Sequence, residues 1–364
     1  MAGSHEKVTY TAVGIRGDFE IFIGNSPSCK VCVQGIHGIA SKHAILKRKG
    51  DSLFIKDLGS QAGTYLNKTR LPQNRWKEIT RHDQITICNV PVKISEKLFL
   101  GRDRVGLATT RLHYADRGKD LCQGVYLRAE PGTLTAIMGP SGAGKSVFLK
   151  LINGYYRPTK GRVIIGDKPN IFDLHRHLEH IRDFLGYVPQ EDLMIPELTV
   201  RQSLHYRLRL RFPEMEALVR QKLIDETCEQ LGFASSRREK FLDTHIEVLS
   251  GGERKRANIA LELITKPLIL ILDEPTSGLS SMDSVRIVAL LKELARRDKL
   301  TIIATIHQPG RKMFSMFDNL MLLGYGGLMG YFGPSDKATD YVLEVTGRFC
   351  GERNPAEFLM ELFE

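Results

Sequence analysis

The sequence predicts a protein of two folded domains, a β-sandwich in the first quarter and an α/β domain over the remainder. The chain has 364 residues, of which 42% are hydrophobic and 26% are charged, and this composition is typical of folded globular proteins. Short strand-like segments before residue 98 give way to alternating strands and long helical runs after residue 108. A glycine-rich loop between a strand and a helix lies in the second region. No run of about 18 apolar residues occurs, so no segment is predicted to cross a bilayer.

Residues 8–97 are predicted to form the β-sandwich. The expected strands are rich in β-branched and aromatic residues, and turn signals such as Gly24-Asn25, Gly50-Asp51 and Gly59-Ser60 separate them. These strands are residues 8–13, 19–23, 31–33, 43–47, 52–58 and 85–94. Short strands alternating with turns over about 90 residues are typical of two packed sheets. Residues 98–108, which contain two glycines, are predicted to be a linker.

Most of the net positive charge lies in residues 1–97, which include the predicted sandwich. The formal net charge is +10, and residues 1–97 contain 15 Lys and Arg against 8 Asp and Glu. A basic cluster is formed by Lys42, Lys47, Arg48 and Lys49. Two interpretations stay open: a face that binds an acidic peptide, an anionic lipid or a nucleic acid, or an ordinary solvated basic face.

The six cysteines are scattered along the chain, which indicates a reducing compartment and not a disulfide framework. Cys29 and Cys32 are closely spaced, but a redox motif would need a βαβ context and a zinc site would need a second pair of ligands. The spacing of His175, His177 and His180 fits no common metal motif. We therefore interpret both groups as structural residues.

Residues 139–146 form the most specific motif of the chain. Their sequence, Gly-Pro-Ser-Gly-Ala-Gly-Lys-Ser, fits the phosphate-loop pattern GxxxxGK[ST] between an apolar strand at 134–138 and a helical run at 147–153. Glycines let backbone amides close around phosphate oxygens, beside the positive end of the helix dipole. We expect Lys145 to contact the β- and γ-phosphates of a nucleotide and Ser146 to coordinate Mg²⁺. The residues expected to bind the nucleotide in this loop are Gly139, Pro140, Ser141, Gly142, Ala143, Gly144, Lys145, Ser146 and Val147.

Asp273 and Glu274 follow another apolar strand, at residues 268–272. A buried strand that ends in two carboxylates presents them at its tip, beside the phosphate loop. We expect Asp273 to hold Mg²⁺ through its water shell and Glu274 to polarise the attacking water. Phosphoryl transfer depends mainly on positioning and charge neutralisation, so a lysine, a metal and a water-orienting base form a sufficient set.

Residues 249–253, Leu-Ser-Gly-Gly-Glu, resemble the signature motif of ABC-type ATPases. The resemblance implies that Gln190, in Tyr-Val-Pro-Gln, belongs to a Q-loop that contacts Mg²⁺, and that His307, before Gln-Pro, contacts the γ-phosphate. It also implies that Tyr114, which lies 31 residues before Lys145, stacks on adenine. The signature residues that would contact the nucleotide are Ser250, Gly251, Gly252 and Glu253. The catalytic residues would be Lys145, Gln190, Glu274 and His307, and the metal ligands Ser146, Gln190 and Asp273.

Further segments resemble the G subfamily of ABC transporters. These segments are residues 251–265, 272–279, 305–309 and 354–358. The resemblance covers about residues 109–364 and implies a nucleotide-binding domain at 109–350, with a helical subdomain at about 191–250. Residues 351–364 would then begin a connecting helix towards a membrane domain, which in that subfamily follows in the same chain. We therefore expect a cytosolic fragment of a longer protein, located at the cytoplasmic face of the cell membrane.

Two segments bear on coupling within such a transporter. The D-loop at 277–280 reads Ser-Gly-Leu-Ser, with Ser280 where the family usually has the aspartate that helps to couple the two ATP sites. Residues 191–209 are basic and predicted to be helical, and they resemble the transmission region of the subfamily. An ordinary solvated helix is the alternative for this stretch.

The resemblance also implies a partner, because one chain supplies one phosphate loop and one signature. In ABC proteins the signature of one subunit faces the nucleotide of the other, which predicts a homodimer that encloses ATP and Mg²⁺. A nucleic-acid partner is not expected. Two alternatives stay open: a soluble ABC ATPase acting on DNA or ribosomes, and a phosphopeptide adaptor whose ATPase domain is a switch.

Residues 8–97 resemble a forkhead-associated (FHA) domain. The positions that maintain its fold are present as Gly24, His43, Gly63, Thr64 and Asn67. The ligand positions differ, because Asn25, Ala40 and Ala62 replace the family's Arg, Ser and Asn. Loss of a guanidinium removes a bidentate phosphate contact that Asn cannot supply. We expect a regulatory or docking domain with a protein partner; the nearby polar residues that could compensate are Ser41, Lys42 and Gln61.

Overall fold

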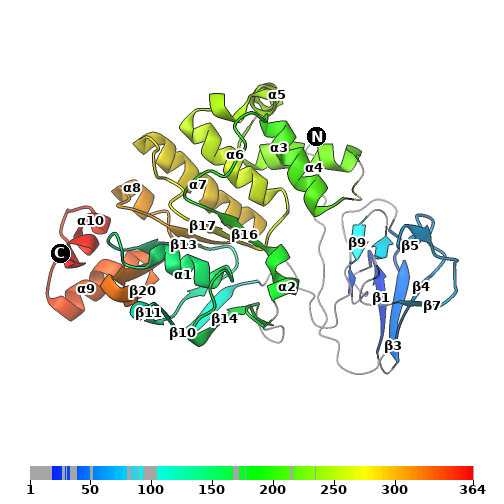
Figure 1. Cartoon of the computed structure of the whole chain (residues 1–364), viewed down its shortest axis with the longest axis horizontal. Helices are drawn as coiled ribbons and strands as arrows, with labels where there is room; N and C mark the ends of the chain where they lie inside the picture. Colours follow the sequence, from blue (N-terminus) through cyan, green and yellow to red (C-terminus); the bar gives the residue numbers. More distant parts are fainter. Residues whose placement is uncertain are drawn as a thin grey trace. The chain divides into compact units, whose positions relative to one another are not determined.

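A computed structural model describes most of the chain. The described residues are 19–26, 29, 31–32, 39–49, 52–79, 83, 85–87, 90–92, 105–166, 172–176, 178–213, 215, 217–233 and 235–363. They fall into two compact units, one ending at Val92 and the other beginning at Val105 (Figure 1). The predicted strand at 8–13 lies outside the described residues.

The first unit consists of two β-sheets, as predicted. The first sheet has the order β2-β1-β3-β4-β7, and the second has the order β6-β5-β8-β9. The strands are β1 (Phe19–Gly24), β2 (Val31–Cys32), β3 (Ala44–Lys49), β4 (Ser52–Asp57), β5 (Thr64–Leu66), β6 (Thr69–Arg70), β7 (Lys77–Ile79), β8 (Ile85–Ile87) and β9 (Val90–Val92). Buried Ile21, Leu46 and Ile55 from one sheet and Leu66 and Ile85 from the other form a common core.

One strand prediction in this unit was wrong, and three strands were missed. The segment predicted as one strand at 85–94 is an antiparallel pair, β8 and β9, in which Ile85 lies opposite Val92. The sequence is rich in β-branched residues on both sides, so the pattern alone does not show where the chain reverses. Strands β5, β6 and β7 were not predicted, because two or three residues are too few to show an alternation.

A buried polar network ties the loops of the first unit together. The His43 Nε2–H donates to the Gly63 carbonyl at 3.1 Å, and the Ala40 N–H donates to His43 Nδ1 at 3.3 Å. Buried Asp57 accepts hydrogen bonds from both the backbone and the hydroxyl of Ser60 and from the Thr64 hydroxyl. Burial lowers the pKa of His43, although the Gly63 carbonyl and the Asp57 charge oppose the shift.

The second unit is built on one large sheet (Figure 1). Its parallel part has the order β19-β13-β18-β17-β16, and the strands are β13 (Leu134–Met138), β16 (Leu185–Val188), β17 (Ile269–Leu272), β18 (Thr301–Thr305) and β19 (Asn319–Gly324). Every residue of β13, β17 and β18 is buried, which accounts for their largely apolar sequences. The mainly antiparallel part contains β10 (Leu107–Asp116), β11 (Lys119–Val125), β12 (Arg128–Ala129), β14 (Lys160–Ile165), β15 (Phe172–Asp173) and β20 (Leu328–Pro334). Because β10 begins at Leu107, the predicted linker at 98–108 extends too far.

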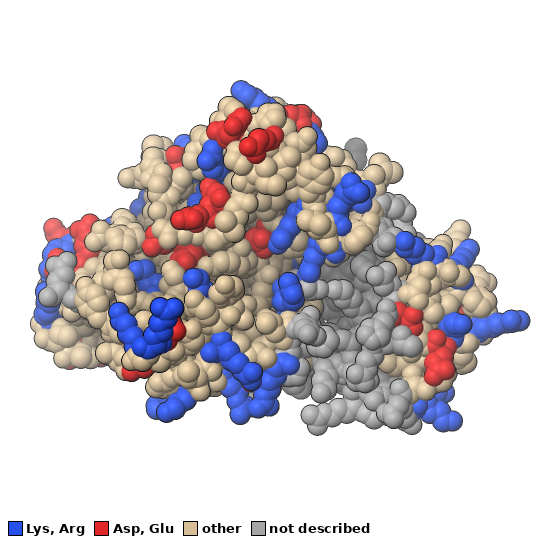
Figure 2. Space-filling model, viewed as in Figure 1, with Lys and Arg blue, Asp and Glu red and all other residues tan. Residues whose placement is uncertain are grey.

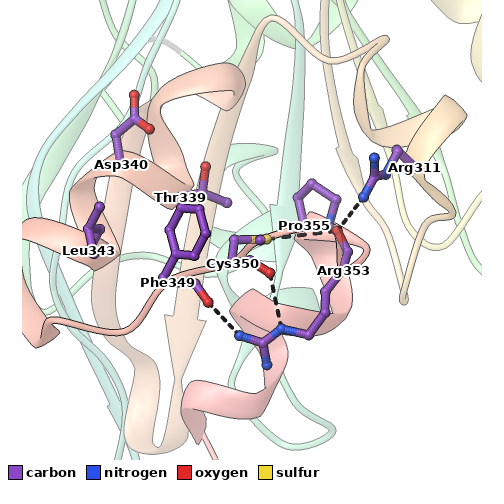
Figure 3. A pocket seen from close by; sticks show the side chains of 9 residues that line it. Arg311, Thr339, Asp340, Leu343, Phe349, Cys350, Arg353 and Pro355 are labelled. Atoms are coloured by element: carbon purple, nitrogen blue, oxygen red, sulfur yellow. Dashed lines mark hydrogen bonds between the residues drawn. The ribbon is translucent and has the colours of Figure 1, made fainter.

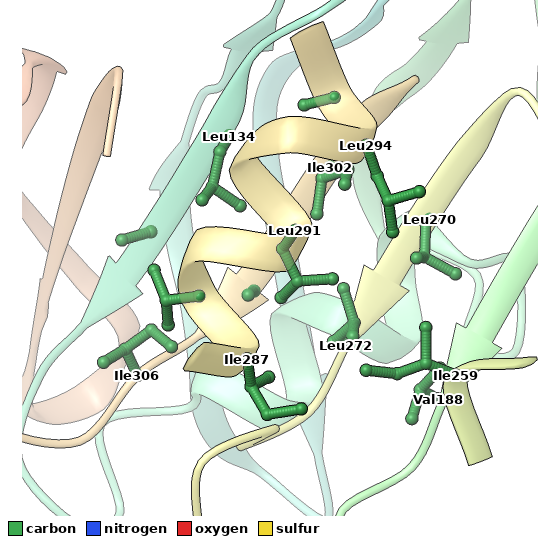
Figure 4. Packing of buried hydrophobic residues seen from close by; sticks show 14 of the residues in the cluster. Leu134, Val188, Ile259, Leu270, Leu272, Ile287, Leu291, Leu294, Ile302 and Ile306 are labelled. Carbon is green, nitrogen blue, oxygen red and sulfur yellow. The ribbon is translucent and has the colours of Figure 1, made fainter. Parts of the chain in front are cut away.

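Helices cover the sheet. They are α1 (Lys145–Ile152), α2 (Leu178–Ile181), α3 (Val200–Arg211), α4 (Ala217–Gln230), α5 (Ser235–Asp243), α6 (Gly251–Leu263), α7 (Ser281–Asp298), α8 (Arg311–Phe314), α9 (Ala338–Thr346) and α10 (Pro355–Met360). Figure 4 shows Ile287, Leu291 and Leu294 of α7 packed against the strands, near Leu272 and Ile302. Among the described residues, no helix combines the length and apolar character needed to cross a bilayer.

Two predictions of helical structure need correction. Residues 191–199 are not helical, because α3 begins only at Val200, where the Thr199 side chain caps it and Pro196 lies in the preceding turn. The predicted connecting helix at 351–364 contains α10, which is six residues long and is followed by a 3₁₀ turn. Phe358 and Leu359 of α10 are fully buried in the core of the second unit.

Acid should weaken the first unit through His43. Its pKa is below the ordinary 6.5 in the folded state, so below pH 6.5 the unfolded chain binds more protons and the stability falls. Hydrogen exchange of the β3 and β4 amides, corrected for the intrinsic pH dependence of exchange, should show faster opening at pH 5.5 than at pH 7.5. The variant His43→Gln cannot titrate and should lose most of this difference; an unchanged difference would contradict the assignment.

Candidate active site

The predicted phosphate loop connects β13 to α1. A Cβ at Gly139 would lie 2.1 Å from the Leu323 carbonyl oxygen, and one at Gly144 would lie 2.5 Å from the Leu121 carbonyl oxygen. Gly144 also has a φ of 89° and is the N-cap of α1. Both positions therefore require glycine, and the loop reaches the N-terminus of α1 with its backbone amides free of bulky side chains.

Lys145 lies folded over this loop and is only 7% exposed. Its Nζ donates to the carbonyl oxygens of Gly139 at 2.8 Å and Pro140 at 3.0 Å. Burial lowers the pKa of Lys145, whereas the nearby carboxylates of Glu274 and Asp273 raise it. A buried ammonium that is held by neutral carbonyls can transfer its hydrogen bonds to an anion that enters the loop.

Asp273 and Glu274 lie at the carboxyl end of β17, as predicted. Asp273 is 5% exposed and accepts a hydrogen bond from the Thr305 hydroxyl at 2.7 Å. The same hydroxyl oxygen accepts the Glu274 N–H at 2.7 Å. Glu274 has a φ of 44°, so this contact fixes a left-handed backbone that directs the glutamate.

Thr305 was not predicted from the sequence. It ends the parallel neighbour β18, and the register that places Leu272 opposite Ala304 brings Thr305 beside Asp273. The available signal was a polar residue at the end of a buried strand, two residues before His307. His307 itself follows β18 with an exposed side chain.

Gln190 completes the row of polar residues at this edge of the sheet. It follows β16, which is the parallel neighbour of β17, with Val188 opposite Leu272. The Gln190 Nε2 donates to Glu274 Oε2 at 3.0 Å. Parallel strands β16, β17 and β18 thus place the polar groups that follow them at one edge, and hydrogen bonds connect Gln190, Glu274, Thr305 and Asp273.

Tyr114 lies on β10 and stacks on Tyr156, with ring centroids 5.0 Å apart and planes 11° from parallel. Desolvation raises the pKa of Tyr114. One face of the ring is therefore already covered by an aromatic partner that the sequence analysis did not identify. The signal was the Tyr155-Tyr156 pair shortly after α1.

The signature residues lie at the N-terminus of α6. Ser250 caps the helix in a capping box: its hydroxyl donates to Glu253 Oε2 at 2.7 Å and accepts the Glu253 N–H at 3.4 Å. In the part of the chain that the structure describes, no hydrogen bond connects residues 249–253 with the phosphate loop at 139–146. The predicted contacts of one nucleotide are therefore distributed over two separate places.

Ser280, which stands where the family usually has an aspartate, caps the N-terminus of α7. Its hydroxyl accepts the Asp283 N–H at 3.1 Å and donates to the Asp283 carboxylate at 2.7 Å, so it is the N-cap of α7. The substitution of aspartate by serine at this position keeps the start of α7 intact.

Polar residues at and near the family's ligand positions form contacts within the first unit. The Asn25 Nδ2 donates to the Ile39 carbonyl at 2.8 Å, and the Arg70 Nη2 donates to the Gln61 carbonyl at 3.0 Å. Lys42 Nζ lies 4.4 Å from the centre of the Phe22 ring. Trp76 likewise packs against the amines of two lysines, Lys47 and Lys56.

In the described part of the chain, no cluster of three or more His, Cys, Asp or Glu residues that could hold a metal ion occurs. Cys29 is buried and donates to the Ser41 carbonyl at 3.0 Å. The His175 Nε2–H donates to the Tyr156 carbonyl at 2.8 Å. The side chains of Cys32, His177 and His180 lie outside the described residues.

A cavity of about 240 Å³ lies between α8, α9 and the segment before α10 (Figure 3). Its arginines satisfy the backbone of that segment: Arg353 donates to the Phe349 and Cys350 carbonyls, and Arg311 donates to the Arg353 carbonyl. None of the predicted site residues lines it. We therefore interpret this cavity as a feature of packing around the segment before α10 and not as part of the candidate site.

Comparison with known protein families agrees with the two units. The family model described as ABC transporter matches residues 122–277, the FHA domain model matches residues 21–88, and the ABC-2 type transporter model matches residues 307–364. The chain therefore contains an FHA domain and an ABC-type ATP-binding domain.

Several curated proteins are similar to this chain. ABC transporter G family member 22 of Arabidopsis thaliana is 38% identical over 67% of this chain and 32% of its own length. ABC transporter G family member 1 of Dictyostelium discoideum is 36% identical over 67% of this chain and 30% of its own length. An ABC transporter ATP-binding/permease protein of Mycobacterium tuberculosis is 34% identical over 81% of this chain and 34% of its own length. The chain thus spans about a third of the length of these relatives.

Solved structures support the fold of the second unit. The cbiO1 protein of Clostridium perfringens, part of the ABC transporter complex cbiONQ, is 26% identical with a TM-score of 0.56, over 66% of this chain and 96% of that chain. An ATP-binding cassette of an ABC transporter in its ADP conformation is 22% identical with a TM-score of 0.57, over 67% of this chain and 96% of that chain.

The FHA domain should show no preference for phosphate on threonine. Asn25 donates to the chain's own backbone, and Ala40 and Ala62 lack the polar groups of the family. Fluorescence titration of the whole chain with a degenerate phosphothreonine peptide library and its unphosphorylated counterpart should give equal, weak binding. Phosphate-dependent binding with a Kd below about 100 µM, or roughly −5.5 kcal/mol, would disprove this expectation.

Proposed function

We propose that this chain, which contains an FHA domain and an ATP-binding domain similar to those of ABC transporter G family members, hydrolyses ATP to drive a membrane transporter. The observation that supports this most directly is the hydrogen-bonded row of Gln190, Glu274, Thr305 and Asp273 at one edge of the sheet. The same unit contains the glycine-rich loop at 139–146, where a side chain at Gly139 or Gly144 would clash with the backbone. It also contains the buried Lys145.

The phosphates would bind along residues 139–147, with Lys145 exchanging its carbonyl partners for the β- and γ-phosphate oxygens. Ser146, Gln190 and Asp273 would hold Mg²⁺, and their hydroxyl, amide and carboxylate oxygens are the donor types that this ion prefers. The ion would supply charge neutralisation for the phosphate oxygens. Asp273 is suited to this role because Thr305 holds its carboxylate in place.

In the hydrolytic step, Glu274 would orient a water molecule and accept its proton while the water oxygen attacks the γ-phosphorus. The bond to the β–γ bridging oxygen then breaks and ADP leaves. His307 would donate a hydrogen bond to the γ-phosphate, and Gln190 would hold Glu274 in the required orientation. Adenine would stack on the Tyr114–Tyr156 pair, whose rings are already parallel.

A second copy of the chain would complete each site. The start of α6 comprises Ser250, Gly251, Gly252 and Glu253, of which Ser250 and Gly251 are exposed, Glu253 is partly buried and Gly252 is buried. A hydroxyl and backbone amides lie together there. Among the described residues, none of these four is hydrogen-bonded to the phosphate loop of its own chain. From the resemblance of the motif to the ABC signature, we infer that they cover the ATP bound by a partner copy. The result would be a head-to-tail homodimer with two ATP molecules between the subunits.

The membrane partner would be an ABC membrane domain, at the cytoplasmic face of the cell membrane. The match of residues 307–364 to an ABC-2 type transporter model and the names of the G family relatives support this proposal. Leu193, Tyr206 and Leu210 are exposed apolar residues in and before α3, and they would form the transmission surface.

The FHA domain would dock a protein partner. Stimulation of ATP hydrolysis by nucleic acid would favour the alternative of a soluble ABC ATPase.

Glu274→Gln should stop hydrolysis and trap the ATP-bound dimer. Loss of the proton acceptor should lower kcat at least about 100-fold, because general-base catalysis contributes about 10²–10⁴. Analytical ultracentrifugation should then show a dimer with ATP and Mg²⁺ and a monomer without them. A wild-type rate that rises only linearly with protein concentration, together with an E274Q variant that stays monomeric with ATP, would count against the dimer.

Thr305→Val should lower kcat about tenfold and leave ATP affinity nearly unchanged. The variant removes the hydrogen bonds that hold the Asp273 carboxylate and the Glu274 N–H, and one such bond has a net value of about 1 kcal/mol. Steady-state kinetics and a binding titration would measure the two effects. Thr305→Ser keeps the hydroxyl and should retain most of the rate; equal loss in both variants would argue against the role of the hydroxyl.

A further inference from the structure

Lys255 is a buried cation that the proposed ATP site does not yet use. It lies on α6, five residues after Ser250, and is only 4% exposed. Its Nζ lies 3.3 Å from the Gln190 carbonyl oxygen and 3.5 Å from Asp192 Oδ1. Both partners belong to the segment directly after β16.

A second residue of α6 strengthens this contact. The Asn258 Nδ2 donates to Asp192 Oδ1 at 2.7 Å. Lys255 and Asn258 are three residues apart, so they lie on the same face of α6 and hold residues 190–192 against it. Asn258 is also nearly buried, with 6% exposure.

The geometry makes this attachment rigid. A buried ammonium is stable only when it is paired and hydrogen-bonded, and Lys255 has a carboxylate and a carbonyl oxygen as its partners. Removal of the Asp192 charge would leave the buried Lys255 ammonium poorly compensated. These contacts therefore hold the segment at 190–192 against α6.

Gln190 connects this attachment to the candidate catalytic residue. Its carbonyl oxygen accepts from Lys255, while its side-chain Nε2 donates to Glu274 Oε2 at 3.0 Å. A chain of contacts thus connects the start of α6 with Glu274: it runs along α6 to Lys255, and from Lys255 through Gln190 to Glu274. Ser250, at one end of the path, would meet the ATP bound by the partner copy.

We propose that Lys255 is a positioning residue that transmits the position of the signature segment to Glu274 through Gln190. This inference rests on the proposed function, because it requires ATP hydrolysis at Glu274. When α6 moves on contact with the partner's nucleotide, the segment at 190–192 moves with it and places Glu274. The path is independent of the D-loop, where Ser280 supplies no charge and its hydroxyl is used to cap α7.

The test compares the whole chain with variants at Lys255, at Asp192 and at a matched control lysine. Lys266 also forms an ion pair near the end of α6, with Glu226 at 3.3 Å, but it is solvent-exposed and far along the chain from Ser250. ATP hydrolysis gives kcat and KM, and equilibrium titration with ATP in the Glu274→Gln background gives the affinity. Circular dichroism melting reports folding in each variant.

We expect Lys255→Met to lower kcat about 10- to 100-fold with ATP affinity changed less than about threefold, because misplacement of a catalytic group by about 1 Å has such effects. Lys255→Arg should restore most of the rate, and Lys266→Met should resemble the wild type. Asp192→Asn should also lower kcat, and the double variant K255M/D192N should be no slower than K255M alone, because the two residues act as one unit.

The other possible outcomes would contradict either the proposed function or this inference alone. A wild-type chain that binds ATP without hydrolysing it would disprove the proposed function, and the inference with it. Active wild-type protein with K255M equal to K266M, or with K255M and D192N effects that add, would overturn the inference alone. If the K255M variant does not fold, the K255R and D192N variants test the inference instead. A normal kcat in a folded D192N variant would also overturn the inference.

Discussion

The parallel arrangement of β16, β17 and β18 is the constraint on which the candidate site depends. These strands are adjacent and in register, with Leu272 opposite both Val188 and Ala304. The residues that follow them in sequence are far apart along the chain, yet their polar groups meet at one edge. Hydrogen bonds from Gln190 and Thr305 then orient Glu274 and Asp273. A shift of one residue in any strand would turn its side chains to the other face and disperse this group.

The start of α1 and the start of α6 use the same physical property in different ways. Both present backbone N–H groups at the positive end of a helix. At α1 the preceding loop is kept open by glycines that tolerate no Cβ, and the buried Lys145 supplies positive charge. At α6 the first turn is closed by the capping box of Ser250 and Glu253, and only Ser250 and Gly251 are exposed there. In the proposed homodimer, each nucleotide would contact the start of α1 in one copy and the start of α6 in the other.

The FHA domain keeps the buried framework of its fold although Asn25, Ala40 and Ala62 stand at the family's ligand positions. His43, Asp57, Ser60 and Thr64 form a buried hydrogen-bonded network that connects the loops between strands. Such buried polar groups are costly to disturb, since each would lose its partners without access to water. Asn25 is attached to the backbone of the neighbouring loop and contributes to the same framework. These buried contacts therefore stabilise the two-sheet arrangement of the unit.

The fold class was evident from the sequence, and so were the motifs from which the candidate site was predicted. The glycine and lysine pattern of the phosphate loop, the carboxylates after an apolar strand and the signature motif are local signals, because each depends on neighbouring residues. What the sequence could not show was pairing across the chain: the division of residues 85–94 into two strands, the Tyr156 ring beneath Tyr114, and the position of Thr305 between Asp273 and Glu274. These contacts join residues that lie up to 42 positions apart along the chain. The attachment of residues 190–192 to α6 by Lys255 is of the same kind, because only tertiary structure brings an otherwise ordinary lysine within 3.3 Å of the Gln190 carbonyl.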